Sequence, residues 1–307
     1  MSVIGFDTSN YTTSIAYFDG LDGINQSKPL PVKEGELGLR QSDAVFHHTK
    51  GLPELSDRLF CDIDIDTVTA VGVSTRPRAV EGSYMPCFLI GYSHAKLLAD
   101  ALHVPLIECS HQQGHIAASL WSAKRMELMD MPHLAWHLSG GTTELLLVEP
   151  DGKNVRCTRI GGTSDISAGQ LIDRTGQLLG LPFPSGRQLD AIAADAKNTD
   201  TFHIKCPELE FSFSGLQNKV QDYWDNCQNR AETAAFALRC VCYGVGKATQ
   251  NAMKRYPDYP VVFSGGVASN SMLRKYITDL NPIFCQPQFS TDNAMGVAVL
   301  TYRCQEG

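Results

Sequence analysis

The sequence lacks features that mark several classes of protein. Its ten cysteines form no CxxC pair, and the closest two, Cys240 and Cys242, would lie on different faces of a helix. This argues against a disulfide scaffold or a zinc ribbon and favours free thiols in a reducing compartment. No apolar run approaches the roughly 18 to 20 residues that a membrane span needs. The first residues have no basic segment before an apolar core, so we expect no signal peptide and a cytoplasmic location.

Positive charge is also scarce. Lys and Arg total 26 against 33 Asp and Glu, a formal net charge of -7. This argues against a protein that grips nucleic acid with its whole surface. If RNA is the substrate, a local patch or a partner must supply the positive charge. Hydrophobic residues at 43% and charged residues at 19% are otherwise those of an ordinary globular protein.

The sequence also lacks a linker rich in Pro, Gly or Ser between its halves. Its 307 residues nevertheless exceed the usual size of a single hydrophobic core. The length therefore predicts two packed domains. Ser2 to Phe18 reads as a hairpin whose turn is the polar stretch from Asp7 to Thr13. A buried strand at Val71–Ser74, a loop and a helical pattern over Phe88–Leu102 follow, an order typical of α/β folds.

The second half repeats this opening. Leu134–Leu138 and Thr143–Val148 read as strands around a small, hydroxyl-rich turn. Later, a strand at Val261–Ser264 runs into Gly265–Asn270 and a helix, and a last helix starts near Asn293. Two hairpins with such turns, one opening each half, suggest a duplicated fold that binds an anionic ligand, because exposed backbone N–H groups and hydroxyls can cradle phosphate.

Two histidines have the spacing of metal ligands. Ser110 is placed to cap a helix that carries His111 and His115 on one face. From the residues alone two interpretations stay open: polar side chains on a solvated helix, or two ligands of a metal. A metalloprotease is disfavoured, because the glutamate that serves as base in His-Glu-x-x-His is missing.

Taken in order, the motifs resemble the TsaD-type threonylcarbamoyl transferases of tRNA, a family formerly described as glycoprotein endopeptidases. The resemblance implies two actin-like (ASKHA, ribonuclease H-like) α/β domains with a ligand cleft between them. We place the first domain at residues 1–129 and the second at 130–307, with the last helix packing back on the first. The matching segments are Phe6–Ser9, Ser110–His115, Leu138–Thr143, Ile160–Thr163, Asp173–Leu181, Phe211–Leu216, Gly265–Asn270 and Ser290–Asn293.

The same resemblance assigns site residues. It puts His111, His115 and Asp292 on one divalent metal ion, iron or zinc, with manganese equally compatible with such ligands. It puts the turn Ser139, Gly140 and Gly141 around a phosphate. The residues implied to contact the nucleoside are Asp173, Gly186, Asp190 and Asn270. From its own sequence context, Asp292 could equally be the N-cap of the last helix.

The implied reaction is transfer of a threonylcarbamoyl group from its adenylate to an amine, in the family the adenosine beside the tRNA anticodon, with the metal acting as Lewis acid. A smaller actin-like subunit and an ATPase are the implied partners. A metal site built from both halves would couple metal binding to domain closure.

The chain departs from the family at several places. Tyr11 and Thr12 stand where acidic residues are usual, Arg76 and Arg78 flank a proline in place of Gly-Pro-Gly, and Thr142 replaces a histidine. We expect Arg76 and Arg78 to recognise an anion, the alternative being a solvated loop.

These departures keep two other hypotheses open. One is an actin-like ATPase or small-molecule kinase, for which Asp7 could hold magnesium. That reading leaves the histidine pair without a purpose. The other is a non-catalytic, nucleotide-binding regulatory paralogue, supported by the loss of acidic residues at Tyr11 and Thr12.

Overall fold

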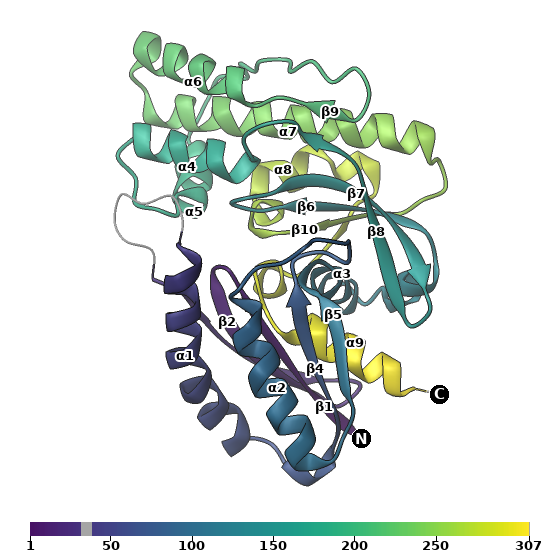
Figure 1. Ribbon diagram of the computed structural model, residues 1–307. Coiled ribbons are helices and arrows are strands. Elements are labelled where there is room, and N and C mark those ends of the chain that lie inside the picture. Colours follow the sequence, from purple (N-terminus) through teal and green to yellow (C-terminus); the bar gives the residue numbers. More distant parts are fainter. Residues whose placement is uncertain (32–38, 307) are drawn as a thin grey trace. The chain divides into compact units, whose positions relative to one another are not determined.

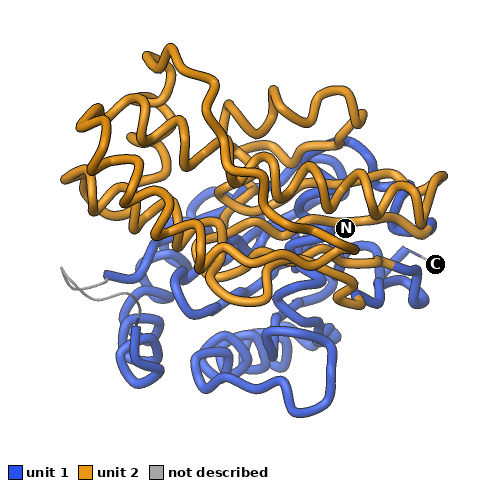
Figure 2. The backbone as a smooth tube through the Cα atoms, turned by 90° about the horizontal axis from the view of Figure 1, so that it is seen from above, with its two compact units in different colours: residues 1–131, 149–157, 292–307 blue, residues 132–148, 158–291 orange. Residues whose placement is uncertain are grey.

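A computed structural model describes residues 1–31 and 39–306. The chain forms two compact units, coloured separately in Figure 2. Unit 1 comprises residues 1–131, 149–157 and 292–307, and unit 2 comprises residues 132–148 and 158–291. No helix in the described residues is both long and apolar enough to cross a membrane. All ten cysteines are free thiols.

Unit 1 is built on a five-stranded sheet in the order β3-β2-β1-β4-β5. Strands β1 to β3 form an antiparallel meander, and β4 and β5 extend the sheet in parallel with β1. Helices α1 and α2 pack on one face, and α9 with α3 behind it covers the other (Figure 1). The elements are β1 (Ser2–Ser9), β2 (Thr12–Phe18), β3 (Gly23–Pro29), β4 (Val68–Arg76), β5 (Leu106–Ser110), α1 (Gln41–Cys61), α2 (Phe88–Leu102), α3 (His111–Ser122), α9 (Met295–Gln305) and the 3-10 turns η1 (Ile65–Thr67) and η2 (Met126–Asp130).

The first hairpin differs from its sequence-based prediction. Its turn consists of Asn10 and Tyr11 alone, because β1 continues to Ser9 and β2 starts at Thr12. The polar residues expected in a loop are therefore paired across the ladder, Asp7 with Ser14 and Ser9 with Thr12. Buried hydrogen bonds to other elements satisfy many of these side chains. Polar residues that favour turns can therefore occupy strand positions here.

Alternation along β1 sends successive side chains to opposite faces of the sheet. Ile4 and Phe6 join the core under α1 and α2. Thr8 points the same way, donating to the Cys87 carbonyl and accepting from the Gly91 amide of α2. Gly5, by contrast, meets the backbone of α9. Asp7 and Ser9 therefore point to the α9 side.

Helix α9 lies unusually close to its neighbours. A Cβ added at Gly296 would lie 1.8 Å from the carbonyl oxygen of Gly114 in α3. On the sheet side, a Cβ at Gly72 of β4 would lie 1.8 Å from the hydroxyl of Thr301. Glycine at these positions lets α9 fit between the sheet and α3.

Unit 2 repeats the plan of unit 1. Its six-stranded sheet has the order β11-β10-β6-β7-β8-β9. Its first five strands, β11-β10-β6-β7-β8, correspond in order to β5-β4-β1-β2-β3 of unit 1. As in unit 1, the two hairpin strands β6 and β7 are antiparallel, and β10 and β11 run parallel to β6. The expected duplication is confirmed. The elements are β6 (His133–Leu138), β7 (Thr143–Asp151), β8 (Asn154–Thr163), β9 (Glu210–Phe211), β10 (Val261–Ser264), β11 (Ile283–Phe284), α4 (Ala168–Leu178), α5 (Gly186–Ala193), α6 (Ser214–Cys227), α7 (Arg230–Arg255), α8 (Ser271–Tyr276) and the 3-10 turns η3 (Gly266–Ser269), η4 (Thr278–Leu280) and η5 (Pro287–Phe289).

The core of unit 2 lies between its sheet and the long helix α7. Trp136 of β6 is fully buried and donates its indole N–H to the hydroxyl of Thr249 in α7 at 2.9 Å. Cys240 and Cys242 are both buried in α7, because this helix packs against α4, α5, α6 and α8 as well as the sheet.

Candidate functional site

Helix α3 begins with a double cap that fixes its first turn. The Ser110 hydroxyl accepts from the Gln113 amide, and the Gln113 side chain accepts from the Ser110 amide at 2.8 Å. This capping box satisfies two amides that a helix start leaves unpaired. His111 is then the first helical residue, and His115 lies one turn later on the same face.

Three side chains converge beside this turn, all of them within unit 1. The Nε2 atoms of His111 and His115 lie 2.9 Å apart. The Asp292 Oδ1 atom lies 3.5 Å from the first and 3.3 Å from the second. Asp292 comes from the segment that leads into α9. Since all three belong to one compact unit, the expected coupling of metal binding to domain closure does not follow from their positions.

These separations suit a bound cation. A tetrahedral metal with bonds of about 2.0–2.1 Å holds its ligand atoms roughly 3.3 Å apart. The three separations here, 2.9, 3.3 and 3.5 Å, bracket that value. Two imidazoles and a carboxylate also leave coordination positions open for water or substrate. The residues present therefore fit a divalent metal ion.

A second tier of polar groups stands behind these ligand atoms. Asp7 of β1 is fully buried, and its Oδ1 lies 3.0 Å from Nδ1 of His111. The same oxygen accepts from the Ser74 hydroxyl of β4. The Ser9 hydroxyl donates to Oδ2 of Asp292 at 3.1 Å. Sequence reasoning missed Ser9 and Ser74 and gave Asp7 another role; the i, i+2 spacing of Asp7 and Ser9 was the available signal.

The charges of this group are strongly coupled. Burial lowers the pKa of His111, but the charges and hydrogen bonds of Asp7 and Asp292 more than offset this and raise the pKa to about 10. Burial raises the pKa of Asp292, yet His111 and His115 outweigh it and hold the pKa well below its usual value. Two carboxylates thus favour positive charge at this point, whether a proton or a metal ion carries it.

The predicted phosphate turn lies between β6 and β7 in unit 2. Ser139 closes it, its amide donating to the Thr142 carbonyl and its hydroxyl accepting from the Thr142 amide. Gly140 and Gly141 have no neighbour within 4 Å of a Cβ position, so space is open there. The start of α4 abuts the turn, because the hydroxyl of its cap, Ser167, donates to the Gly140 carbonyl at 2.6 Å.

The predicted nucleoside residues are held by protein contacts. Oδ1 of Asp173 in α4 accepts from the Ser185 amide at 2.8 Å, and burial raises the pKa of Asp173. Asp190 in α5 accepts from the Asn270 side chain at 2.9 Å. Asn270 also caps α8. Gly186 is the first residue of α5. The structure thus brings Asp190 and Asn270 together.

The residues that depart from the family motifs are mostly exposed. Tyr11 is 44% exposed at the tip of the first hairpin, and Thr12 is half-buried. Arg76 at the end of β4 and Arg78 beyond it are exposed. Thr142 completes the turn that Ser139 closes.

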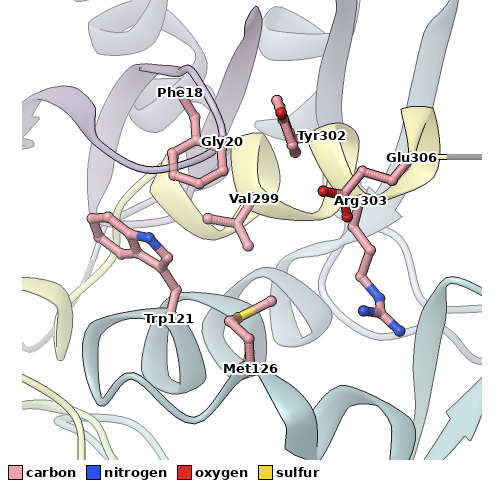
Figure 3. Close-up of a pocket in the computed structure, with 8 residues that line it drawn as sticks. All are labelled: Phe18, Gly20, Trp121, Met126, Val299, Tyr302, Arg303 and Glu306. Carbon is pink, nitrogen blue, oxygen red and sulfur yellow. The ribbon is translucent and has the colours of Figure 1, made fainter. Parts of the chain in front are cut away.

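A cavity of about 190 Å³ lies elsewhere in unit 1. Phe18, Trp121 and Tyr302 line it together with Arg303 and Glu306, and the ring of Phe18 forms T-shaped pairs with those of Trp121 and Tyr302 (Figure 3). None of the predicted site residues lines this cavity. The chemistry considered below therefore does not involve this cavity.

The repeated sheet order defines the class of protein, a duplicated actin-like α/β fold. Solved structures share it. The chain superposes on full-length HypF with a TM-score of 0.64 at 14% identity, covering 100% of this chain and 47% of HypF, so it spans about half of that protein. For the Acidaminococcus fermentans (R)-2-hydroxyglutaryl-CoA dehydratase component A the TM-score is 0.58 at 13% identity, and the match covers 99% of this chain and 98% of that protein. A Streptomyces griseus ROK glucokinase gives a TM-score of 0.55 at 10% identity, and the match covers 99% of this chain and 100% of that protein.

Sequence comparison then gives the family. The family model of TsaD, tRNA N6-adenosine threonylcarbamoyltransferase, matches residues 33–299. A protein of that name from Streptococcus pneumoniae serotype 2 (strain D39 / NCTC 7466) is 30% identical over 96% of this chain and 90% of its own length. One from Streptococcus equi subsp. zooepidemicus (strain MGCS10565) is 32% identical over 83% of this chain and 77% of its own length. The chain belongs to the TsaD family of transferases.

Proposed function

We propose that this protein transfers a threonylcarbamoyl group from threonylcarbamoyl adenylate to the N6 amine of an adenosine in tRNA, and that the reaction needs one divalent metal ion. Family membership supports the transfer to tRNA. The convergence of two imidazole nitrogens and a carboxylate oxygen supports the metal dependence.

The transfer forms one bond and breaks one. The adenosine N6 atom bonds to the carbamoyl carbon, the bond from that carbon to the adenylate oxygen breaks, and AMP leaves. The N6 atom loses one proton. No protein nucleophile is needed, so the protein's contribution is to position the reactants and to stabilise charge.

Each group of site residues has a proposed task. His111, His115 and Asp292 hold the cation, which would supply Lewis acidity toward the threonylcarbamoyl group. The turn Ser139–Gly141 offers backbone N–H groups to the phosphate, helped by the positive end of α4. Asp173, Gly186, Asp190 and Asn270 contact the nucleoside. The ligand set suits iron or zinc, and manganese remains compatible.

The kinase alternative loses support from the surroundings of Asp7. Its Oδ1 is engaged by His111 and Ser74, and the side chain is fully buried. A carboxylate that holds magnesium and activates a substrate hydroxyl must reach both. The likeness to a glucokinase concerns the fold alone. The hypothesis of a non-catalytic regulatory paralogue is still supported by Tyr11 and Thr12, which stand where the family usually has acidic residues.

Partner proteins would supply what this chain lacks. With a net charge of -7, it has little positive charge to offer an RNA. The resemblance implies a smaller actin-like subunit and an ATPase. Leu89 and Leu97 of α2, which are 51% and 71% exposed, are apolar side chains available for contact with such a subunit.

The proposal is tested by turnover. Purified protein, with partner subunits from the same organism, is mixed with threonylcarbamoyl adenylate, tRNA and Fe²⁺, Zn²⁺ or Mn²⁺, and nucleosides are analysed by mass spectrometry. We expect threonylcarbamoyl adenosine with wild type and with His94→Gln, a control histidine on α2, and none with His115→Ala. If wild type binds metal and adenylate but modifies no tRNA, the regulatory alternative replaces the proposal.

A further inference from the structure

Two alternate residues of one strand each hold a different candidate metal ligand. Asp7 contacts His111 at Nδ1, and Ser9 donates to Oδ2 of Asp292. Both point to the α9 face of the sheet. The ligand atoms that converge are the opposite ones, Nε2 of His111 and Oδ1 of Asp292. Strand β1 therefore contacts, in each of these two ligands, the polar atom that faces away from the point where the ligand atoms converge.

We infer that Asp7 and Ser9 are the positioning residues of the metal site: Asp7 fixes the ring of His111 so that Nε2 faces the ion, and Ser9 fixes the carboxylate of Asp292. This inference rests on the proposed function, since it presumes that an ion binds there. Neither residue contacts the ion or the substrate; each acts through a ligand.

The contact at His111 determines the position of a proton. A carboxylate accepts hydrogen bonds and donates none when ionised. With Asp7 ionised, the hydrogen bond at 3.0 Å places the proton on Nδ1, so Nε2 is the nitrogen that faces the metal. Ser74 donates to the same Asp7 oxygen and so holds the carboxylate in place from β4.

A purely structural role for Asp7 is a poor explanation of its surroundings. The side chain is fully buried, and its Oδ2 atom has no hydrogen-bond partner among the described residues. Burying a carboxylate that is incompletely satisfied costs free energy unless positive charge lies close by. The position opposite Asp7 on β2, Ser14, supplies only a hydroxyl that donates to the Asp7 carbonyl. Asp7 is thus retained at a cost that a cation at His111 would offset.

The test measures the binding of metal alone. Zn²⁺ affinity is determined by competition with a chromogenic chelator, and Co²⁺ absorption reports the ligand geometry. We expect Asp7→Asn and Asp7→Ala to weaken Zn²⁺ binding by about 10- to 100-fold, the usual effect of losing such an outer partner. Ser9→Ala should weaken it by about 3- to 10-fold, the equivalent of one hydrogen bond. The Co²⁺ spectrum should change in the Asp7 variants, and excess metal should restore their turnover.

Thr8→Val is the matched control. It removes two buried hydrogen bonds from the opposite face of the same strand, so it should lower stability without changing Zn²⁺ affinity. Zn²⁺ affinities within twofold of wild type and unchanged Co²⁺ spectra in both Asp7 variants would overturn the inference while leaving the proposed function intact. Equal losses in Thr8→Val and the Asp7 variants would overturn it as well, because they would show general destabilisation. Failure of wild type to bind Zn²⁺ or Co²⁺ would instead refute the metal dependence itself.

Discussion

At the scale of single residues, His48 is an uncharged group in the core of unit 1. It is fully buried in α1, its Nδ1 lies 2.8 Å from the Thr13 hydroxyl, and its Nε2 has no partner among the described residues. Burial lowers the pKa of His48 to about 4, against the opposing charge of Asp7. The native state therefore excludes the proton that an unfolded chain would accept.

The sign of the pH effect follows from this difference. The unfolded chain takes up the proton near pH 6.5 and the folded chain only near pH 4, so stability is full above about 6.5 and is lost as pH falls toward 4. We expect the free energy of unfolding to fall by about 2 kcal/mol between pH 7.5 and pH 5 from this group. Urea titrations of wild type and His48→Asn check this. The variant should lose that share of acid sensitivity, whereas His47→Asn, a neighbour on the same helix, should keep it.

Asp173 gives a second prediction at this scale. Asp173→Asn keeps an oxygen for the Ser185 amide but removes the negative charge proposed to accept from the nucleoside. We expect the dissociation constant for adenine nucleotides to rise at least tenfold, about 1.4 kcal/mol, because hydrogen bonds to charged groups contribute about that much or more. Calorimetric titration measures it. Asp195→Asn, an exposed change just beyond α5, is the control. An unchanged constant would remove Asp173 from the site.

At the scale of elements, the close contact between α3 and α9 decides whether the metal ligands can meet. His111 and His115 are carried by α3, and Asp292 lies just before α9. A Cβ at Gly296 would collide with the Gly114 backbone, which no side-chain rotation can relieve. The spacing of these helices is thus fixed by residues that touch no ligand.

Gly296→Ala should therefore weaken both the fold and the site. We expect it to destabilise the protein by about 1–3 kcal/mol, or more if the helices cannot separate, and to reduce the content of bound divalent metal in purified protein. Urea unfolding and elemental analysis provide the measurements. The control is Gly215→Ala in α6, where a Cβ would meet nothing within 4 Å; it should be neutral or stabilise by about 0.5–1 kcal/mol. Wild-type stability in Gly296→Ala would contradict the packing described here.

At the scale of the whole molecule, the candidate metal links segments that are far apart in the chain. Asp292 returns to unit 1 only after the whole of unit 2 has been traversed. An ion bound to the folded state and not to the unfolded chain stabilises the fold by about 2.7 kcal/mol at a hundredfold excess over its dissociation constant.

Removing the metal should accordingly lower the melting temperature of wild type, and adding it back should restore the original value. His115→Ala should start at the lower temperature and respond to neither chelator nor metal. Differential scanning calorimetry under matched buffer conditions makes the comparison. A wild-type melting temperature insensitive to chelation and to added Fe²⁺, Zn²⁺ and Mn²⁺ would count against a metal at this site.

The features that the sequence by itself determined are local or repetitive. Ser110, Gln113 and the i, i+4 spacing of the histidines specify a capped helix with two imidazoles on one face, and the structure has that helix. The duplicated hairpins likewise specified an α/β fold built twice. Such features depend on backbone periodicity and on hydrogen bonds between residues a few positions apart, which a single sequence displays directly.

Tertiary structure alone decided which distant groups reach the ligands. Ser9 and Asp292 are 283 residues apart, and Asp7 and His111 are 104 apart. The sequence placed Asp7 in a turn, where its orientation would be undefined. Pairing of β1 with β2 and β4 places Asp7 in a strand, and packing of α9 on one face of that sheet decides which alternate residues meet the metal ligands. Face selection of this kind depends on long-range packing, which local pattern does not encode.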